Sequence, residues 1–189
     1  GFLPPVPLPR RMWAGGRLHW EHDLVIGDAI ERVSTIKSVT HKSGRSGDLL
    51  FVLVEHQIHN AKGLALTEEH DIVYRAAASP DEKVPDPTPA PSDAKWSKII
   101  QPDPVLLFRY SALTFNGHRI HYDEPYAKSV EGYSGLVVHG PLLAQKLILM
   151  AEVFQGFLSD FSFRATAPLM HFETATLSLS KLDSNKEYT

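Results

Sequence analysis

One segment of the chain, residues 141–158, has the apolar spacing of a long helix, whereas the other apolar segments are typical of strands. Its apolar residues recur at helical intervals, at Leu143, Leu147, Met150, Phe154 and Leu158, with Leu142, Leu149 and Val153 beside them. Pro141 suits the first turn, where its missing N–H group would have no helical partner. The apolar face is broad, so we expect a helix that is largely buried against a sheet.

Residues 17–75 are rich in β-branched and aromatic residues and are interrupted by short turns that contain glycine. We expect strands here at residues 18–24, 29–41, 49–59 and 64–74. Glycine adopts the positive φ angles of such turns at little cost. Further strand-like segments, residues 105–115 and 161–179, lie on either side of the predicted helix. The sequence therefore predicts a strand-rich chain with one long buried helix.

The composition changes between residues 79 and 104, where seven prolines stand among Asp and Lys residues with little apolar content. Proline cannot donate a backbone hydrogen bond, so we expect a linker and no core element in this stretch. The linker separates a β-rich N-terminal half, residues 1–78, from a C-terminal half, residues 105–189, that holds the helix. The chain opens without Met and its polar tail, residues 182–189, ends where another strand would be needed, so we expect it to be incomplete at both ends.

The overall composition excludes several classes of function. The 189 residues are 43% hydrophobic, which is enough for a sizeable core. The net charge is -3 without a basic stripe, so nucleic acid is not an expected partner. Cysteine is absent, which removes thiol nucleophiles, thiolate zinc sites and disulfides and favours an intracellular location. The longest apolar run, residues 49–54, is too short to cross a bilayer, so we expect no membrane partner.

The densest group of chemically active side chains lies at residues 116–123, and His139 follows immediately before the predicted helix. A histidine has a pKa near neutrality, so it can both accept and return a proton in one catalytic cycle. His118, His121 and Asp123 also have the spacing of metal ligands, with His139 as a conceivable further ligand. A proton-transfer site and a metal site are therefore both open on these residues alone.

The segment FRYSALTFNGHRIHYD, residues 108–123, resembles the active-site segment of the MaoC-like hot-dog hydratases and dehydratases. Tyr126, Ala127 and residues 132–140 extend the resemblance into the turn before the central helix. Within the family, the chain is most similar to type 2 hydroxyacyl-thioester dehydratases and to mesaconyl- and itaconyl-CoA hydratases. The resemblance implies an α+β double hot dog, in which antiparallel sheets wrap a long central helix. Residues 18–75 resemble the β-rich part of a degenerate first hot dog, whose own helix is not present in this chain.

The resemblance implies a hydro-lyase that interconverts a 3-hydroxyacyl thioester and a 2-enoyl thioester with (R) specificity, on CoA or on an acyl carrier protein. His121 is the implied proton-transferring residue, and the Gly140 N–H is the expected donor to the thioester oxygen. We expect His118, Arg119 and His139 to bind the substrate. The resemblance implies no cofactor and no metal, and we expect a homodimer located in mitochondria or the cytoplasm.

Asn116 departs from the simplest members of this family, which carry an aspartate five residues before the catalytic histidine. An Asn side chain has no titratable proton, so Asn116 can orient water or substrate but cannot act as a base. We interpret it as a mark of the type 2 branch, in which His121 carries more of the proton transfer with help from Asp123 or His118. The alternatives are a catalytically silent thioester-binding hot dog and a hot-dog thioesterase.

Several of these residues also have ordinary structural explanations. Arg119 could form a surface salt bridge, and His139 could cap the helix that follows it. Asp123 and Glu124 are expected to open a short helix, where acidic side chains complement the helix dipole. The remaining aromatic and histidine side chains of note are expected to be structural: Tyr110, Tyr126, His19, His56 and His70.

Overall fold

The computed structural model describes residues 1–44, 47–76, 90 and 92–180, and the chain forms two compact units. The first unit contains Gly1–Glu82 and Phe157–Thr166, and the second contains Lys83–Gly156 and Ala167–Thr189. The segment Phe157–Thr166 follows the second unit's long helix in the sequence but belongs to the first unit. Each unit is therefore built from segments that are distant in the sequence.

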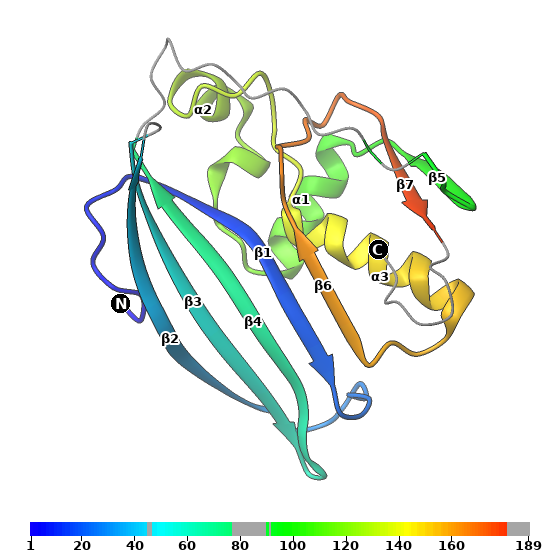
Figure 1. Cartoon of the computed structure of the whole chain (residues 1–189). Helices are drawn as coiled ribbons and strands as arrows, with labels where there is room; N and C mark the ends of the chain where they lie inside the picture. Colours follow the sequence, from blue (N-terminus) through cyan, green and yellow to red (C-terminus); the bar gives the residue numbers. More distant parts are fainter. Residues whose placement is uncertain (45–46, 77–89, 91, 181–189) are drawn as a thin grey trace. The chain divides into compact units, whose positions relative to one another are not determined.

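The first unit is an antiparallel five-stranded sheet with the strand order β2-β3-β4-β1-β6 (Figure 1). Its strands are β1 Arg10–Trp20, β2 Glu31–Gly44, β3 Gly47–Asn60, β4 Gly63–Arg75 and β6 Asp160–Arg164. The strands predicted at residues 29–41, 49–59 and 64–74 are confirmed, with small shifts at their ends. β3 and β4 meet in a tight turn at Gly63, whose φ of 110° is accessible to glycine at little cost.

β1 begins well before the strand predicted at residues 18–24 and ends at Trp20, so that prediction was wrong in its bounds. A glycine pair is unusual inside a strand, and here close packing requires it. A Cβ atom on Gly15 would lie 2.5 Å from the carbonyl oxygen of Phe163 on β6. A Cβ atom on Gly16 would lie 2.9 Å from the carbonyl oxygen of Glu69 on β4. Only glycine therefore lets these two strands flank β1 so closely.

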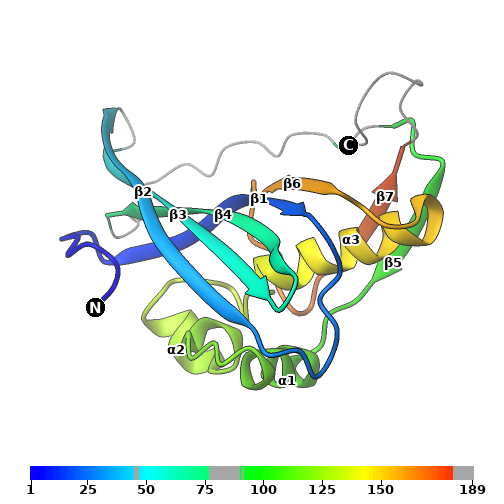
Figure 2. The ribbon, with the colours of Figure 1, turned by 90° about the horizontal axis from the view of Figure 1, so that it is seen from below.

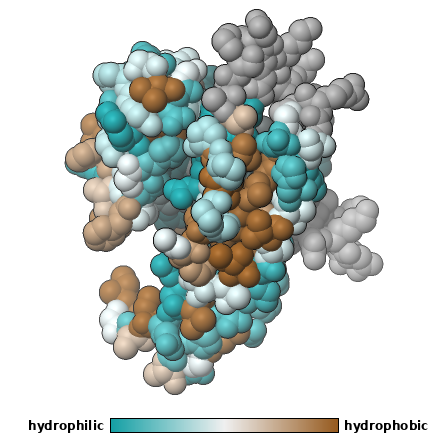
Figure 3. Space-filling model, turned by 90° about the vertical axis from the view of Figure 1, so that its left-hand side faces the viewer, coloured by the Kyte–Doolittle hydropathy of each residue, from teal (hydrophilic) through white to brown (hydrophobic). Residues whose placement is uncertain are grey.

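One face of this sheet carries the core of the first unit. Its buried residues alternate along β3 and β4, as expected of strands with one buried face, and are Val52, Val54, Ile72 and Tyr74. Apolar residues of the proline-rich N-terminal segment pack against them: Leu3, Val6 and Leu8. On the edge strand β2, Val33 and Val39 remain 45% and 50% exposed. Hydrophobic side chains gather on the side of the molecule where the N-terminus and β2 lie (Figures 1 and 3).

The second unit combines helices with one antiparallel strand pair, β5 and β7 (Figures 1 and 2). Its elements are β5 Trp96–Ile100, α1 Pro104–Leu113, the short 3-10 helix η1 Arg119–His121, α2 Glu124–Ser129, α3 Gly140–Gln155 and β7 Ala175–Leu179. β5 corrects the expectation that residues 79–104 hold no core element, because Ile100 is buried. The prolines stand mostly before this strand, and residues 77–89 and 91 lie outside the described residues.

Helix α1 occupies the place of the strand predicted at residues 105–115, so that prediction was wrong. The Asp103 carboxylate caps the helix by accepting a hydrogen bond from a backbone N–H group of the first turn at 2.8 Å. Pro104 fills the first helical turn, where no N–H group is needed. The dipeptide Asp103-Pro104 was thus a helix-start signal, although the apolar and aromatic residues after it are also common in strands.

The helix predicted at residues 141–158 is confirmed as α3, which ends at Gln155 and is followed by the cap residue Gly156 with a φ of 79°. The short helix expected after Asp123 is confirmed as α2, and the Asp123 Oδ1 accepts the Tyr126 N–H at 3.1 Å. The strand-like segment 161–179 holds β6 and β7. The tail at residues 182–189 lies outside the described residues. Within the described ranges, no helix is long and apolar enough to cross a membrane.

Candidate active site

His121 ends η1 and is 8% exposed. Its Nδ1 lies 2.7 Å from the carbonyl oxygen of Val137. A carbonyl oxygen only accepts hydrogen bonds, so Nδ1 carries the proton and donates it, while Nε2 keeps its lone pair in the neutral ring. The neutral His121 side chain therefore has one defined atom, Nε2, that can accept a proton.

Val137, whose carbonyl orients His121, is itself held from two directions. Its N–H donates to the carbonyl of Ile120 at 3.0 Å, and Val137 forms a β-bridge with Met170. Ile120, Val137 and Met170 also belong to one buried apolar cluster. The Val137 carbonyl, which accepts the His121 hydrogen bond, is therefore fixed by buried packing and by backbone hydrogen bonds.

His139 is fully buried and lies directly against His121. The two imidazole rings stack with centroids 3.7 Å apart and an interplanar angle of 18°. The His139 Nε2 is hydrogen-bonded to the Ser111 Oγ at 2.8 Å, and the Tyr110 ring meets His139 edge-on at 4.9 Å. His139 is the N-cap residue of α3, but its side chain makes no capping hydrogen bond. The helix-capping explanation of its imidazole is therefore wrong, because Ser111 takes that side chain away from the helix end.

Burial sets the protonation state of both rings. Desolvation lowers the pKa of His121 from 6.5 to about 4, although the hydrogen bond to Val137 opposes this shift. Desolvation, followed by the neighbouring His121 and His118, lowers the pKa of His139 to about 3. Both imidazoles are therefore neutral near neutral pH, since burial disfavours the charged form. The lone pair of the His121 Nε2 is present under these conditions.

Asn116 lies in the turn between α1 and η1. Its Oδ1 accepts the His118 N–H at 3.1 Å, and its own backbone N–H donates to the Ser111 carbonyl at 2.9 Å. The preceding residue, Phe115, has a φ of 53°, which is unusual for a bulky side chain. This backbone holds the Asn116 side chain in the turn, and its amide Nδ2 is a donor that can orient a water molecule or a polar substrate group.

Gly140 is the first residue of α3 and directly follows His139. The first N–H groups of a helix have no carbonyl partner within the helix, and Pro141 in the next position has no N–H group. The Gly140 N–H group therefore lies at the positive end of the α3 dipole. Such a group can stabilise an oxygen atom that gathers negative charge.

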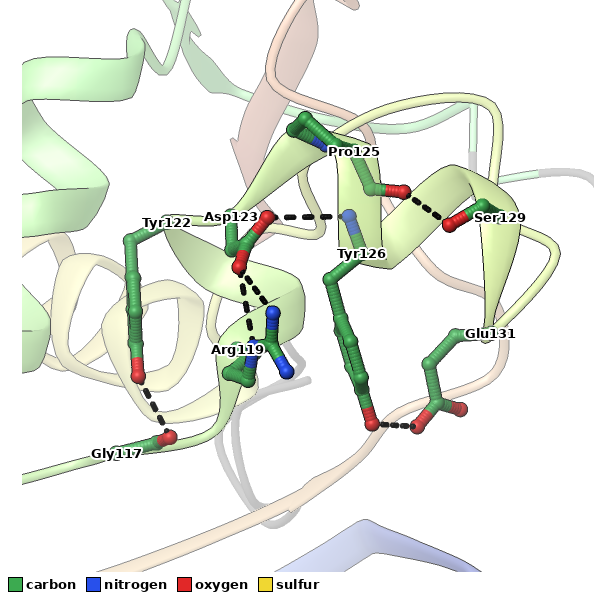
Figure 4. Close-up of polar contacts among 8 residues, drawn as sticks. All are labelled: Gly117, Arg119, Tyr122, Asp123, Pro125, Tyr126, Ser129 and Glu131. Carbon is green, nitrogen blue, oxygen red and sulfur yellow. Dashed lines mark hydrogen bonds and ion pairs between the residues drawn. The ribbon is translucent and has the colours of Figure 1, made fainter.

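Arg119, the first residue of η1, forms polar contacts with its neighbours in the chain (Figure 4). Its Nε and Nη2 donate to the Asp123 Oδ2 at 3.0 and 2.7 Å, and its Cζ lies 4.1 Å from the centroid of the Tyr126 ring. The Tyr126 hydroxyl donates to the Glu131 Oε1 at 3.2 Å. The hydrogen bond between Arg119 and Asp123 raises the pKa of Arg119 and lowers the pKa of Asp123. The salt bridge considered for Arg119 is confirmed.

The His118 ring also lies next to that of His121, with centroids 5.6 Å apart and an interplanar angle of 85°. Its Nε2 is 4.0 Å from the Glu131 Oε1. In the part of the chain that the structure describes, no group of three or more His, Asp or Glu side chains is arranged to hold a metal ion. Asp123, which the sequence spacing suggested as a ligand beside His118 and His121, is bonded to Arg119 instead.

The structure thus brings His118, His121 and His139 together, and it adds two groups that the sequence did not reveal. The sequence did not indicate Ser111 as a site residue, because its segment was predicted as a strand. In a helix it stands one turn after the buried Leu107 on the same face, which is the signal that could have found it. The carbonyl of Val137 has no sequence signal, because any residue supplies a backbone oxygen.

Comparison with known proteins supplies relatives that match most of the chain. The model of the family described as hydroxyacyl-thioester dehydratase type 2 matches residues 1–171. The chain is 51% identical over 176 residues to mesaconyl-C(4)-CoA hydratase of Chloroflexus aurantiacus, covering 89% of this chain and 61% of the relative. It is 26% identical over 192 residues to the mitochondrial hydroxyacyl-thioester dehydratase type 2 of Schizosaccharomyces pombe, covering 87% and 62%. The chain spans less than two thirds of the length of these relatives.

Solved structures with a similar fold include a MaoC-like dehydratase from Phytophthora capsici, with a TM-score of 0.70 and 17% identity over 97% of this chain and 67% of that chain. A protein from Mycobacterium tuberculosis with a double hot-dog fold has a TM-score of 0.55 and 16% identity, covering 89% and 62%. The α+β double hot-dog fold implied by the sequence resemblance is confirmed.

Proposed function

The chain belongs to the family of type 2 hydroxyacyl-thioester dehydratases, and on this premise we propose that it interconverts a 3-hydroxyacyl thioester and a 2-enoyl thioester. The observation that carries the proposal is the hydrogen bond from the His121 Nδ1 to the Val137 carbonyl at 2.7 Å. It leaves Nε2 as the single ring atom for proton transfer. Adding or removing water across the α,β bond of a thioester needs such a proton-transferring group together with a stabilised oxyanion.

In the hydration direction, His121 Nε2 accepts a proton from water while the hydroxyl oxygen bonds to the β-carbon of the enoyl thioester. The electron pair of the double bond moves toward the thioester carbonyl, whose oxygen becomes negatively charged. The imidazolium then returns a proton to the α-carbon, which restores neutral His121. The low pKa of His121, about 4, makes its imidazolium a ready acid, and the nearby enolate charge favours its transient formation. Dehydration is the same sequence reversed.

The negative thioester oxygen needs a hydrogen-bond donor, and the Gly140 N–H at the start of α3 is our candidate. Asn116 has no proton to exchange, so its part in this mechanism is to orient the reacting water molecule or the 3-hydroxyl group. Its position in the turn before η1 supports that part, because its backbone N–H and its side-chain Oδ1 are both hydrogen-bonded. His121 therefore carries the proton transfer without a carboxylate partner.

For the substrate, we propose an acyl thioester of CoA, with an acyl carrier protein as the alternative carrier. The relative that is 51% identical is named as a CoA hydratase, which supports the first choice. The His118 ring lies next to that of His121, Arg119 stands in the same short helix as His121, and both residues are proposed to contact the substrate. The exposed guanidinium of Arg119 suits a phosphate group. His139 was also expected to bind substrate, but its complete burial favours another part, considered below.

The assembly, location and organisation of the protein belong to the same proposal. We propose a homodimer and a location in mitochondria or the cytoplasm, and the similarity to a mitochondrial dehydratase supports the first of these locations. We also propose that residues 1–78 correspond to the degenerate hot-dog half and residues 105–189 to the catalytic half. Residues 79–104 connect them, and β5 at the end of this stretch pairs with β7.

The proposal is tested with 3-hydroxyacyl-CoA and 2-enoyl-CoA substrates of several lengths, mesaconyl-CoA among them. The absorbance of the conjugated thioester should fall during hydration and rise during dehydration. Release of free CoA instead would identify a thioesterase. Saturable binding of acyl-CoA with neither reaction would identify a thioester-binding protein without catalysis. Either of these two outcomes contradicts the proposed function.

A further inference from the structure

The ring of His139 covers one face of the His121 ring. Its ring lies nearly parallel to that of His121, at 18°, with the centroids 3.7 Å apart. It is 0% exposed, so every part of its surface is covered by protein. A residue with no exposed surface that lies flat against the proton-transferring ring is suited to hold that ring and less suited to touch a substrate.

Ser111 is the polar anchor of His139. The Ser111 Oγ is 2.8 Å from the His139 Nε2, and this bond is buried. The other ring nitrogen, Nδ1, is buried and has no hydrogen-bond partner among the residues that the structure describes. Without Ser111, neither nitrogen of the His139 ring would keep a partner, and rotation of the ring would no longer be resisted by a hydrogen bond.

Ser111 itself lies on a rigid base. It is buried on α1 together with Leu107, and Leu107 belongs to a buried cluster with Leu136, Val138 and Leu142. Its carbonyl also accepts the backbone N–H of Asn116 at 2.9 Å. The serine is therefore tied both to the core of the second unit and to the turn that leads into η1.

We propose that Ser111 and His139 are positioning residues that hold His121 in its working orientation. Ser111 fixes the ring of His139 through the Oγ–Nε2 hydrogen bond, and His139 blocks rotation of His121 by stacking on it. The His121 Nδ1 then stays on the Val137 carbonyl and Nε2 remains the atom for proton transfer. The mechanistic part of this inference rests on the proposed function, whereas the orientation of the ring can be measured without any substrate.

The experiment compares Ser111→Ala with Ser111→Thr, which keeps the hydroxyl group. Ser34→Ala is the matched control, because it removes a similar bond, 2.7 Å from the Ser34 Oγ to the His56 Nδ1, in the first unit. Solvent exchange of the His121 Nδ1–H is followed by NMR in histidine-labelled protein, and kcat and KM are measured with an enoyl-CoA. We expect exchange to rise and kcat to fall, each about tenfold, in Ser111→Ala, with KM within about twofold. Ser111→Thr should restore most of both, and Ser34→Ala should change neither.

Unchanged exchange and unchanged kcat in Ser111→Ala would overturn the inference while leaving the proposed function intact. Faster exchange in Ser111→Ala, in a protein whose wild type acts on no thioester, would support the positioning role and contradict the proposed function. If Ser111→Ala does not fold, Ser111→Cys keeps the shape of the side chain and weakens the hydrogen bond. The same exchange and kcat measurements on Ser111→Cys then decide the question.

Discussion

Each unit of the molecule contains a pair of neighbouring histidines, and only one pair is a candidate for catalysis. In the second unit, the rings of His121 and His139 stack at 3.7 Å and 18°. In the first unit, the ring centroids of His56 and His70 are 6.1 Å apart and the rings are inclined at 49°. One histidine of each pair, His139 and His56 respectively, is also hydrogen-bonded to a serine. A serine-bonded histidine pair therefore occurs in both units and does not by itself single out the second.

A histidine with a strongly lowered pKa occurs in both pairs. Desolvation lowers the pKa of both His121 and His70 to about 4. The difference lies in the backbone. His70 stands inside β4, whose peptide groups pair with the strands on both sides, whereas His121 ends a short 3-10 turn and stacks on the residue before Gly140, the first N–H of α3. The helix-start N–H of Gly140 beside a neutral histidine distinguishes the second pair, because such a donor can stabilise a developing oxyanion.

The largest expected effect is a loss of kcat/KM on substitution of His121 that substitution of His70 does not cause. His121→Ala should lower kcat/KM for an enoyl-CoA by about a thousandfold, because general acid–base groups contribute on that order. His70→Ala, which removes an equally neutral histidine from β4, should leave kcat/KM within about threefold of wild type once folding is matched by circular dichroism. A loss in His70→Ala as large as that in His121→Ala would mean that the first unit takes part in the chemistry.

A smaller effect should separate two asparagines that make the same local turn. Asn116 Oδ1 accepts the N–H two residues on at 3.1 Å, and Asn60 Oδ1 does the same at 2.9 Å between β3 and β4. Asn116→Ala should lower kcat about tenfold by removing the group that orients water, whereas Asn60→Ala should leave kcat within about twofold and lower the free energy of unfolding by about 1 kcal/mol. Equal kinetics for the two variants would reduce Asn116 to a turn residue. Steady-state rates and urea unfolding provide the two measurements.

The smallest expected effect concerns pH. Because burial holds the pKa of His121 near 4, the free enzyme keeps its lone pair on acidification, and kcat/KM should fall less than about twofold between about pH 7 and pH 5.5. An ordinary histidine, with a pKa near 6.5, would lose about tenfold over that range. A pH–rate profile of wild type checks this, and an acid limb near pH 6.5 would contradict it.

Acidification should act on stability through a buried histidine in each unit. The folded-state pKa values of His121 and His70 lie below the unfolded value of 6.5, so only the unfolded state gains these protons as the pH falls from 6.5 toward about 4. The contribution is fully present above pH 6.5 and is lost through that window. The free energy of unfolding should therefore fall over a range in which activity per folded molecule barely changes.

Much of this comparison could be anticipated from local patterns. The spacing of apolar residues was enough to predict α3 and most of β2, β3 and β4. Buried residues recur every three to four positions in a helix and every second position in a strand. The short polar cluster at residues 116–123 indicated where the candidate site lies, and Asp123 indicated the start of α2. The strand predicted in place of α1 failed because Leu, Phe and Tyr suit either element, so the capping residue Asp103 was the stronger signal.

The sequence by itself determined the family and the order of most elements, and it led to the proposal of His121 as the proton-transferring residue, since each depends on residues that lie close together along the chain. Only the tertiary structure decided how His121 is oriented and which groups surround it. The Val137 carbonyl, the stacked His139 and the Ser111 hydroxyl come from segments separated by up to 28 residues, and a backbone oxygen has no signature in the sequence. Tertiary packing likewise required the glycine pair of β1 beside β6, because the space available to a Cβ atom depends on a strand far away in the chain.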